Sequence, residues 1–321
     1  MWRRLAAYWL GLVVIGGLVS CEDVPTSTLP GPYVPPPVKG DDGRRLLWEP
    51  KRGERQCYRP DFSPYGSKLV VSYRFGSQAR AADLAILDLN KGKVKVIVEG
   101  NCAKRPAWSP TGEWIAYQSD LDHAPYIWIC KPDGSEHHRL NYKWAWTPRW
   151  SADGKRIYFT CSVNVREKDC GVYHDFNDKE LRTLYRDPLM HVGPPVPSPG
   201  GEKVALWLFS NDENYVDINL AFIDPDSTGF SAVWRGRYEY GWAHPIDWSP
   251  DGKYVLIWYG APRSNQEGLW TYEVKNSVLK QITKCPPEVD FETILGASWG
   301  PNGDIVFASE HGSLYLIKAP E

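Results

Sequence analysis

Two segments of the sequence concentrate aromatic side chains of the kind that form binding surfaces. They supply seven residues: Tyr142, Trp144, Trp146, Tyr238, Tyr240, Trp242 and His244. Exposed Trp and Tyr suit a protein interface or stacking on a sugar ring, because each combines a large apolar face with a polar edge. Three arginines, Arg59, Arg105 and Arg149, would add a rim that attracts anions. The alternative is that these rings pack inside the fold.

A second pattern, Gly296, Ser298 and Gly300, matches the G-x-S-x-G turn that carries the nucleophilic serine of α/β-hydrolases. The chemistry needs that serine on a strand-to-helix turn, beside a histidine and an oxyanion hole. Here a strand-like run, 304–308, follows the motif instead of a helix. We therefore predict that the match is coincidental, and we assign no catalytic residue.

The seven histidines are scattered along the chain without the short spacings of a metal site. His137 and His138 are adjacent, which in a strand directs the two rings to opposite faces. Asp153 and Asp251 lie in turns, where a carboxylate ordinarily accepts backbone hydrogen bonds. We predict no metal and no cofactor, because a metal site would require distant histidines to converge.

The elements that must position these residues follow from a sequence repeat. An aromatic residue followed by a Ser-Pro-x-Gly turn recurs at spacings of 42 to 51 residues. The six copies, of which the fourth is degenerate, begin at Phe62, Trp108, Trp150, Pro197, Trp248 and Trp299. Each copy is followed by short apolar runs of strand length. A period of about 40 to 50 residues with three or four strands is typical of a propeller. The sequence therefore predicts an all-β, six-bladed β-propeller.

The ring needs a closing strand, because the last unit shows only three strands before Glu321. Residues 44–49, with Leu46, Leu47 and Trp48, have strand character and precede the first unit. We expect them to supply the missing strand and to protect the edges that an open blade would expose. The propeller then occupies residues 43–321 and leaves no room within them for a second domain.

The repeat also resembles that of a known family. The turn from Trp248 to Gly252, the strand and aromatic-rich third strand after it, and the ending 279–283 are similar to the TolB-type propeller repeat. The resemblance covers almost the whole chain after residue 42, and it implies a periplasmic binding protein that works with envelope partners such as peptidoglycan-associated lipoproteins. TolB proteins also carry an N-terminal α/β domain, which we expect to be absent here. Similar propellers gate prolyl oligopeptidases and form some metal-assisted polysaccharide lyases.

Residues 1–20 have the order of a secretory signal peptide. Arg3 and Arg4 precede an apolar run from Leu5 to Val19, which is marginal in length for a membrane span. The ending 18–21 resembles the bacterial lipobox, which implies that Cys21 becomes the lipidated first residue after cleavage. Residues 21–42 contain six prolines. They predict an extended tether of about 3 Å per residue.

Acyl chains on Cys21 would anchor the protein to a membrane. We therefore expect a lipoprotein of the bacterial cell envelope, placed at the outer membrane and facing the periplasm or the cell surface. Removal of Arg3 and Arg4 with the signal peptide would change the formal charge from −2 to −4. A mildly acidic chain with no basic stripe has no general attraction for nucleic acid.

An even number of further cysteines suggests disulfides in an exported domain. The six are Cys57, Cys102, Cys130, Cys161, Cys170 and Cys285. Cys161 and Cys170 flank a predicted turn, so they would face each other across a hairpin. Cys57 and Cys102 precede their repeat aromatics by five and six residues, at nearly equivalent positions of adjacent inner strands. Cys130 and Cys285 would pair only by elimination, and buried thiols are the alternative for them.

These inferences favour a non-enzymatic envelope lipoprotein that binds or scaffolds a protein partner. In a propeller, the connections that hold the two aromatic segments gather on one face around the channel mouth. The alternative is a carbohydrate-active propeller that binds or cleaves an envelope or extracellular polysaccharide at that face, and a third possibility is a subunit of a larger assembly. Catalysis would need convergent carboxylates or histidines with displaced pKa values, whereas a scaffold needs an apolar patch with a polar rim.

Overall fold

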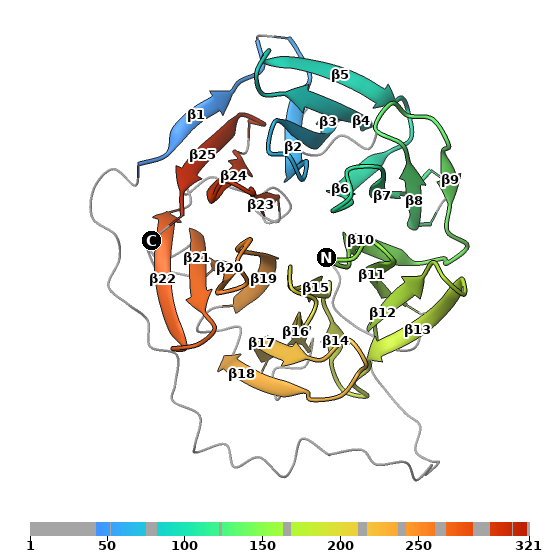
Figure 1. Cartoon of the computed structure of the whole chain (residues 1–321), viewed down its shortest axis with the longest axis vertical. Coiled ribbons are helices and arrows are strands. Elements are labelled where there is room, and N and C mark those ends of the chain that lie inside the picture. Colours follow the sequence, from blue (N-terminus) through green and yellow to red (C-terminus); the bar gives the residue numbers. More distant parts are fainter. Residues whose placement is uncertain are drawn as a thin grey trace, which may run out of the picture. The chain divides into compact units, whose positions relative to one another are not determined.

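The computed structural model describes residues 43–309 and 311–319, apart from 52, 75–81, 122–123, 163–167, 211–216, 237–241, 261–267 and 285–295. The predicted signal peptide, Cys21 and the proline-rich tether lie outside these residues. In the described part, twenty-five β-strands form six antiparallel sheets arranged as blades around a ring (Figure 1). The predicted six-bladed β-propeller is confirmed. Among the same residues, no helix has the length and apolar character needed to cross a bilayer.

Each blade runs from an inner strand at the channel to an outer strand at the rim. The inner strands are β2 (Gln56–Phe62), β6 (Ala103–Trp108), β10 (Ala145–Trp150), β14 (His191–Val192) with β15 (Val196–Pro197), β19 (Trp242–Trp248) and β23 (Ala297–Trp299). The second strands are β3 (Lys68–Arg74), β7 (Ile115–Ser119), β11 (Arg156–Cys161), β16 (Val204–Phe209), β20 (Tyr254–Gly260) and β24 (Asp304–Ala308).

The remaining strands complete each sheet outward, and the blades are numbered one to six from the sheet that begins with β2. The third strands are β4 (Asp83–Asp88), β8 (Tyr126–Cys130), β12 (Cys170–Asp175), β17 (Asp217–Ile223), β21 (Gly268–Glu273) and β25 (Leu314–Lys318). The outer strands are β5 (Lys93–Val98), β9 (His138–Arg139), β13 (Glu180–Tyr185), β18 (Ser231–Gly236), β22 (Val278–Lys284) and β1 (Arg45–Trp48).

The ring closes as the sequence predicted. β1 pairs with β25 in blade six, with Arg45 opposite Leu316 and Leu46 opposite Tyr315. Trp48, at the end of β1, packs against the apolar cluster that blades six and one share. The N-terminal strand therefore covers the edge that β25 would otherwise expose.

The Ser-Pro-x-Gly repeat forms a tight turn between the inner and second strands. In blade five, Tyr254 N donates to Ser249 Oγ at 2.9 Å, and Gly252 N donates to Ser249 O at 2.9 Å. Gly252 has a φ of 70°, a left-handed conformation that glycine adopts readily because it has no Cβ. Four other serines accept the same side-chain bond: Ser63, Ser109, Ser151 and Ser198. One local motif therefore repeats the strand connection around the ring.

The acidic residue of the repeat stabilises this turn. Asp251 Oδ1 accepts hydrogen bonds from Ser249 Oγ at 2.7 Å and Lys253 N at 3.1 Å. Asp153 does the same in blade three. The repeat aromatic has a structural role too, because Trp248 Nε1 donates to Val196 O at 2.9 Å and so joins blade five to blade four. The expectation that these aspartates serve the turns is confirmed.

Candidate functional site

An irregularity in the inner strands sets side chains around the channel. The inner strands of blades one, two and three each contain a proline at an equivalent position. The residues that precede these prolines are Arg59, Arg105 and Thr147. Their φ angles are 50°, 51° and 53°, a left-handed conformation that residues other than glycine rarely adopt. Proline has no N–H to donate to the ladder, and the register of each inner strand shifts at this point. The shared sequence therefore places three side chains at equivalent positions.

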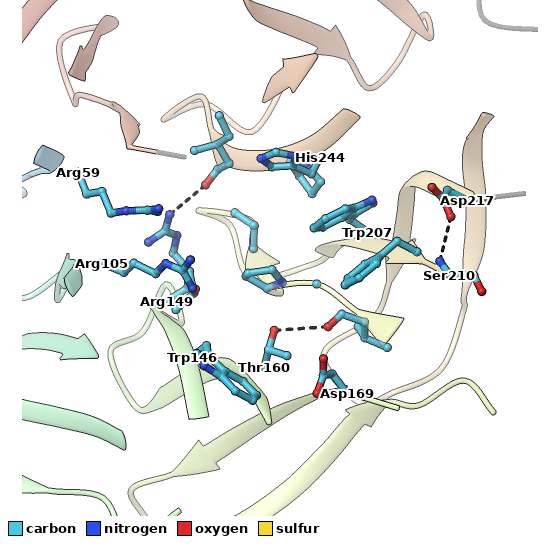
Figure 2. Close-up of a pocket in the computed structure, with 18 residues that line it drawn as sticks. Arg59, Arg105, Trp146, Arg149, Thr160, Asp169, Trp207, Ser210, Asp217 and His244 are labelled. Atoms are coloured by element: carbon cyan, nitrogen blue, oxygen red, sulfur yellow. Dashed lines mark hydrogen bonds between the residues drawn. The ribbon is translucent and has the colours of Figure 1, made fainter. Parts of the chain in front are cut away.

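A cavity of about 610 Å³ lies beside these three residues, which are part of its lining (Figure 2). We call it the aromatic cavity after four residues of its lining: Trp146, Trp207, Phe209 and His244. Figure 2 shows the three arginines Arg59, Arg105 and Arg149 gathered on one side of it, facing the aromatic rings. Its volume falls within the range of about 300–1,000 Å³ that small-molecule sites occupy.

The aromatic wall is built from three blades. Trp207 on β16 stacks on Phe209 with ring centroids 4.5 Å apart, and its ring centroid is 5.1 Å from that of His244 on β19. Trp146 comes from β10 of blade three. Gly193 N donates to Trp207 O at 2.7 Å, and a Cβ at position 193 would lie 2.4 Å from Trp207 Cε3. Glycine at position 193 therefore leaves the space that the indole occupies.

His244 contributes an uncharged ring to this wall. Its side chain is 4% exposed, and its ring centroid lies 5.5 Å from that of Trp258. Burial, together with the positive charges of Arg59 and Arg105, lowers the pKa of His244 to about 3. The imidazole is therefore neutral at physiological pH.

A charged cluster of Asp61, Arg149 and Asp247 lies at the inner strands of three blades. Asp61 Oδ2 accepts from Trp108 N at 2.6 Å, and Asp247 Oδ2 accepts from Trp299 N at 2.7 Å. Each bond joins one blade to the next. Burial raises the pKa of Asp61 to about 6 and also raises that of Asp247, while the charge of Arg149 opposes both shifts. These carboxylates therefore have structural partners, and Arg149 offsets their charge.

A second, smaller cavity adjoins the first. It measures about 260 Å³ and shares Arg59, Arg105 and Trp146 with the aromatic cavity. We call it the polar recess, whose other lining residues are Ser72, Arg74, Lys104, Gln118 and Asp120. Lys104 Nζ lies 2.7 Å from Asp120 Oδ2, and Gln118 Nε2 donates to Asp120 Oδ1 at 2.9 Å. The two arginines and Trp146 thus separate an aromatic compartment from a polar one.

The structure brings together half of the predicted partner-binding residues. Five line the aromatic cavity: Trp146, His244, Arg59, Arg105 and Arg149. Tyr142 instead packs in blade three, where its hydroxyl lies 3.0 Å from His174 Nδ1. Trp144 does not line the cavity, and its ring centroid lies 6.4 Å from that of Trp146. Tyr238, Tyr240 and the side chain of Trp242 lie outside the described residues. Partner binding by these residues stays a prediction.

Sequence reasoning missed the contribution of blade four. Trp207 and Phe209 lie on a second strand whose apolar run resembles that of every other blade. The available signal was Gly193, which stands before a proline as Arg59 does in blade one. Because Gly193 has no side chain, the indole of Trp207 can occupy the channel wall at this point.

The hydrolase-like motif joins blade six to blade one. A Cβ at Gly296 would lie 2.6 Å from Arg59 Cα, and one at Gly300 would lie 2.9 Å from the ring of Phe62. Ser298 Oγ donates to Asp61 Oδ1 at 3.0 Å. Strand β24 follows the motif, so the strand-to-helix turn of a nucleophile is not formed. Among the described residues, no group of three or more His, Cys, Asp or Glu is placed to hold a metal ion.

The cysteines differ from the predicted pairing where they are described. Cys57, Cys102 and Cys130 are thiols in this structure. Cys57 is fully buried in the cluster of blades six and one, so the predicted bridge to Cys102 is not present. Burial raises the pKa of the Cys130 thiol to about 12. Cys285 lies outside the described residues.

Cys161 and Cys170 are placed as the hairpin prediction required. They lie directly opposite each other in the ladder between β11 and β12. Side chains of directly opposed residues share a face of the sheet, and both belong to the same apolar cluster. Cys161 is a thiol in this structure, so the geometry is present without the predicted bridge.

Comparisons with known proteins agree with this fold. No protein-family model matches the chain. An uncharacterized protein of Agrobacterium fabrum, Atu1656, is 25% identical over 228 residues, which cover 68% of this chain and 72% of that protein. A putative TolB structure from Agrobacterium tumefaciens superposes with a TM-score of 0.65 at 15% identity, covering 86% of this chain and 94% of that one. The chain has the TolB-like six-bladed propeller fold.

Two further solved structures share this architecture. TolB from Acinetobacter baumannii superposes with a TM-score of 0.58 at 16% identity; the match covers 84% of this chain, which spans only 64% of that TolB. An oligogalacturonate lyase in complex with manganese superposes with a TM-score of 0.57 at 16% identity, covering 83% of this chain and 91% of the lyase. At these identities the likeness establishes the propeller fold, and function must be argued from the cavity.

Proposed function

We propose that the chain is a lipid-anchored binding protein of the bacterial cell envelope that receives a segment of a protein partner in the aromatic cavity. The observation that carries this proposal is the cavity itself. Trp146 and Trp207, from different blades, present partly exposed rings to a space of about 610 Å³. Large aromatic side chains around a concave site beside arginines are typical of the centre of a protein interface.

The rest of the site supports binding rather than a reaction. Ser298 is bonded to Asp61, and Asp247 accepts a backbone N–H from the next blade. His244 has a pKa of about 3, far from the value near the working pH that suits a general base. Ser298, Asp247 and His244 therefore serve the packing of the channel.

The anchor belongs to the same proposal. Acylation of Cys21 would hold residues 43–321, the propeller, near a membrane through the tether of residues 21–42. Replacing Cys21 with serine removes the thiol that carries the acyl chain. We expect the Cys21→Ser protein to leave the membrane fraction when cells are fractionated, whereas wild type stays with it. Retention of the variant in the membrane fraction would contradict lipidation at this residue.

A chemical cross-linking pull-down from native membranes tests partner binding. Wild type is compared with Trp146→Ala/Trp207→Ala, which removes two rings from the cavity wall. The control is Tyr65→Ala, which removes a 78% exposed ring in a repeat turn at the other end of the inner strands. We expect one envelope protein to be recovered with wild type and Tyr65→Ala and lost with the double variant. Recovery that is equal in all three proteins would place the interface elsewhere. Capture of an envelope polysaccharide instead of a protein would favour the carbohydrate-binding alternative.

A further inference from the structure

The aromatic cavity has an acidic end. Asp217 lines the cavity, and Figure 2 shows it beyond the ring of Trp207, on the side away from the three arginines. Asp217 is the first residue of β17, the third strand of blade four, and it is only 6% exposed. A carboxylate that water barely reaches therefore forms part of the cavity wall.

This carboxylate has one hydrogen bond and no cationic partner among the described residues. Asp217 Oδ1 accepts from Ser210 N at 3.0 Å, whereas Oδ2 accepts no hydrogen bond from the described part of the chain. Burial raises the pKa of Asp217, and the hydrogen bond from Ser210 N opposes this shift. The charges of Arg59 and Arg105 contribute to the shift at His244 and not to the shift at Asp217. A buried carboxylate without a nearby positive charge is unfavourable.

Blade one shows how the same position is satisfied within the protein. Asp83 is the first residue of the third strand β4, as Asp217 is of β17, and it is also 6% exposed. Asp83 Oδ1 accepts from Gly100 N at 2.8 Å, and Oδ2 forms an ion pair with Arg55 Nη1. The carboxylate of blade four has the backbone hydrogen bond but not the cation. A ligand with a positive charge would complete it.

We propose that Asp217 binds the ammonium group of a lysine side chain that a protein partner inserts into the aromatic cavity. This inference rests on the function proposed above and names the chemistry of the inserted side chain. One oxygen of the carboxylate already accepts a backbone N–H. The other oxygen suits an ammonium group, a compact charge, better than the planar guanidinium group of arginine, which pairs with two oxygens at once.

The rings beside Asp217 suit the rest of a lysine side chain. Trp207 and Phe209 lie on β16, which pairs with β17, and their ring centroids are 4.5 Å apart. An aromatic face attracts a cation, and the aliphatic stem of lysine packs against apolar surface. Asp169, the other acidic residue of the lining, is less suited, because its Oδ2 lies 2.9 Å from His191 Nδ1. A lysine that entered here would therefore meet rings along its stem and Asp217 at its end.

Two pooled sets of blocked octapeptides test this inference on the full-length protein in detergent. Every peptide of the first set holds one Lys beside Trp or Leu. The second set replaces Lys with norleucine, which keeps the aliphatic stem and removes the ammonium group. Peptides retained by the immobilised protein are quantified by mass spectrometry at an ionic strength of about 0.15 M, which screens exposed charges. We expect wild type to retain the Lys set at least about tenfold better, as a charge-assisted hydrogen bond requires.

Variants then assign the effect to Asp217. Asp217→Asn keeps an oxygen that accepts from Ser210 N and removes the charge, so it should abolish the preference for Lys. The matched control Asp133→Asn makes the same change at an exposed aspartate that accepts from Ser135 N at 2.9 Å and does not line the cavity, so it should keep the preference. Phe209→Leu removes an aromatic face and should weaken the preference if Asp217→Asn does not fold.

The outcomes separate this inference from the proposed function. Equal retention of the two sets, with loss of both in Trp146→Ala/Trp207→Ala, would overturn the lysine site and leave peptide binding in place. An undiminished preference for Lys in folded Asp217→Asn would overturn the assignment to Asp217. Retention of neither set would overturn the inference, and an unchanged pull-down would show that the function stands without it. Retention of free choline in place of the Lys peptides would overturn the assignment to a protein segment.

Discussion

Replacing His244 with glutamine should change how the stability of the propeller depends on pH. The folded pKa of His244 is about 3, below the ordinary value of 6.5, so the unfolded chain binds the proton more readily between these values. The stability that the neutral ring contributes is present above pH 6.5 and is lost as the pH falls toward 3. For these two pKa values, the linkage relation gives a loss of about 2 kcal/mol between about pH 7 and pH 5.

Urea unfolding of the full chain at the two pH values measures this loss. Asp61 titrates in the same range with the opposite sign, because its pKa of about 6 lies above the ordinary value of 3.8 and favours the folded state at low pH. That term is common to wild type and His244→Gln, so comparison of the two proteins isolates the histidine. Wild type should lose about 2 kcal/mol more than the variant. The same loss in both proteins would refute the placement of His244 as a buried, neutral ring.

Three other changes test particular contacts. Gly193→Ala places a Cβ 2.4 Å from Trp207 Cε3, so it should displace the indole and reduce recovery of the cross-linked partner several-fold while circular dichroism stays that of wild type. Unaltered recovery would contradict the crowding. Ser298→Ala removes a hydrogen bond to a carboxylate and should lower the free energy of unfolding by about 1–3 kcal/mol in urea, which an unshifted midpoint would rule out. Because Cys161 is a buried thiol in this structure, native protein should resist alkylation there and urea-unfolded protein should be alkylated without a reductant; resistance of the unfolded protein would contradict the free thiol.

The fold could be predicted from the sequence because its information is local and repeated. Each Ser-Pro-x-Gly copy specifies one turn between an inner and a second strand, as the bonds of Ser249 show. The closing strand β1 was predictable for a related reason, since the last unit lacked a strand and residues 44–49 had the composition to provide it.

The site was predictable only in part, because it depends on contacts between distant blades. Clusters of aromatic residues in the sequence identified Trp146 and His244 as residues of the cavity. Tyr142 belongs to the same cluster as Trp146, yet it packs inside blade three. Trp207 carried no local signal, since its position in the cavity depends on the space left by Gly193 on a neighbouring strand. Cysteine spacing likewise placed Cys161 correctly but could not show which cluster encloses Cys57.

A photo-cross-linking residue placed at position 207 tests the central claim most directly. The same residue at position 65, in a repeat turn, gives the matched control, because Tyr65 is 78% exposed. If the aromatic cavity receives a protein segment, illumination of cells should join position 207 to one envelope protein, and position 65 should not capture it. Capture of that protein from position 65 and not from 207 would contradict binding in the cavity.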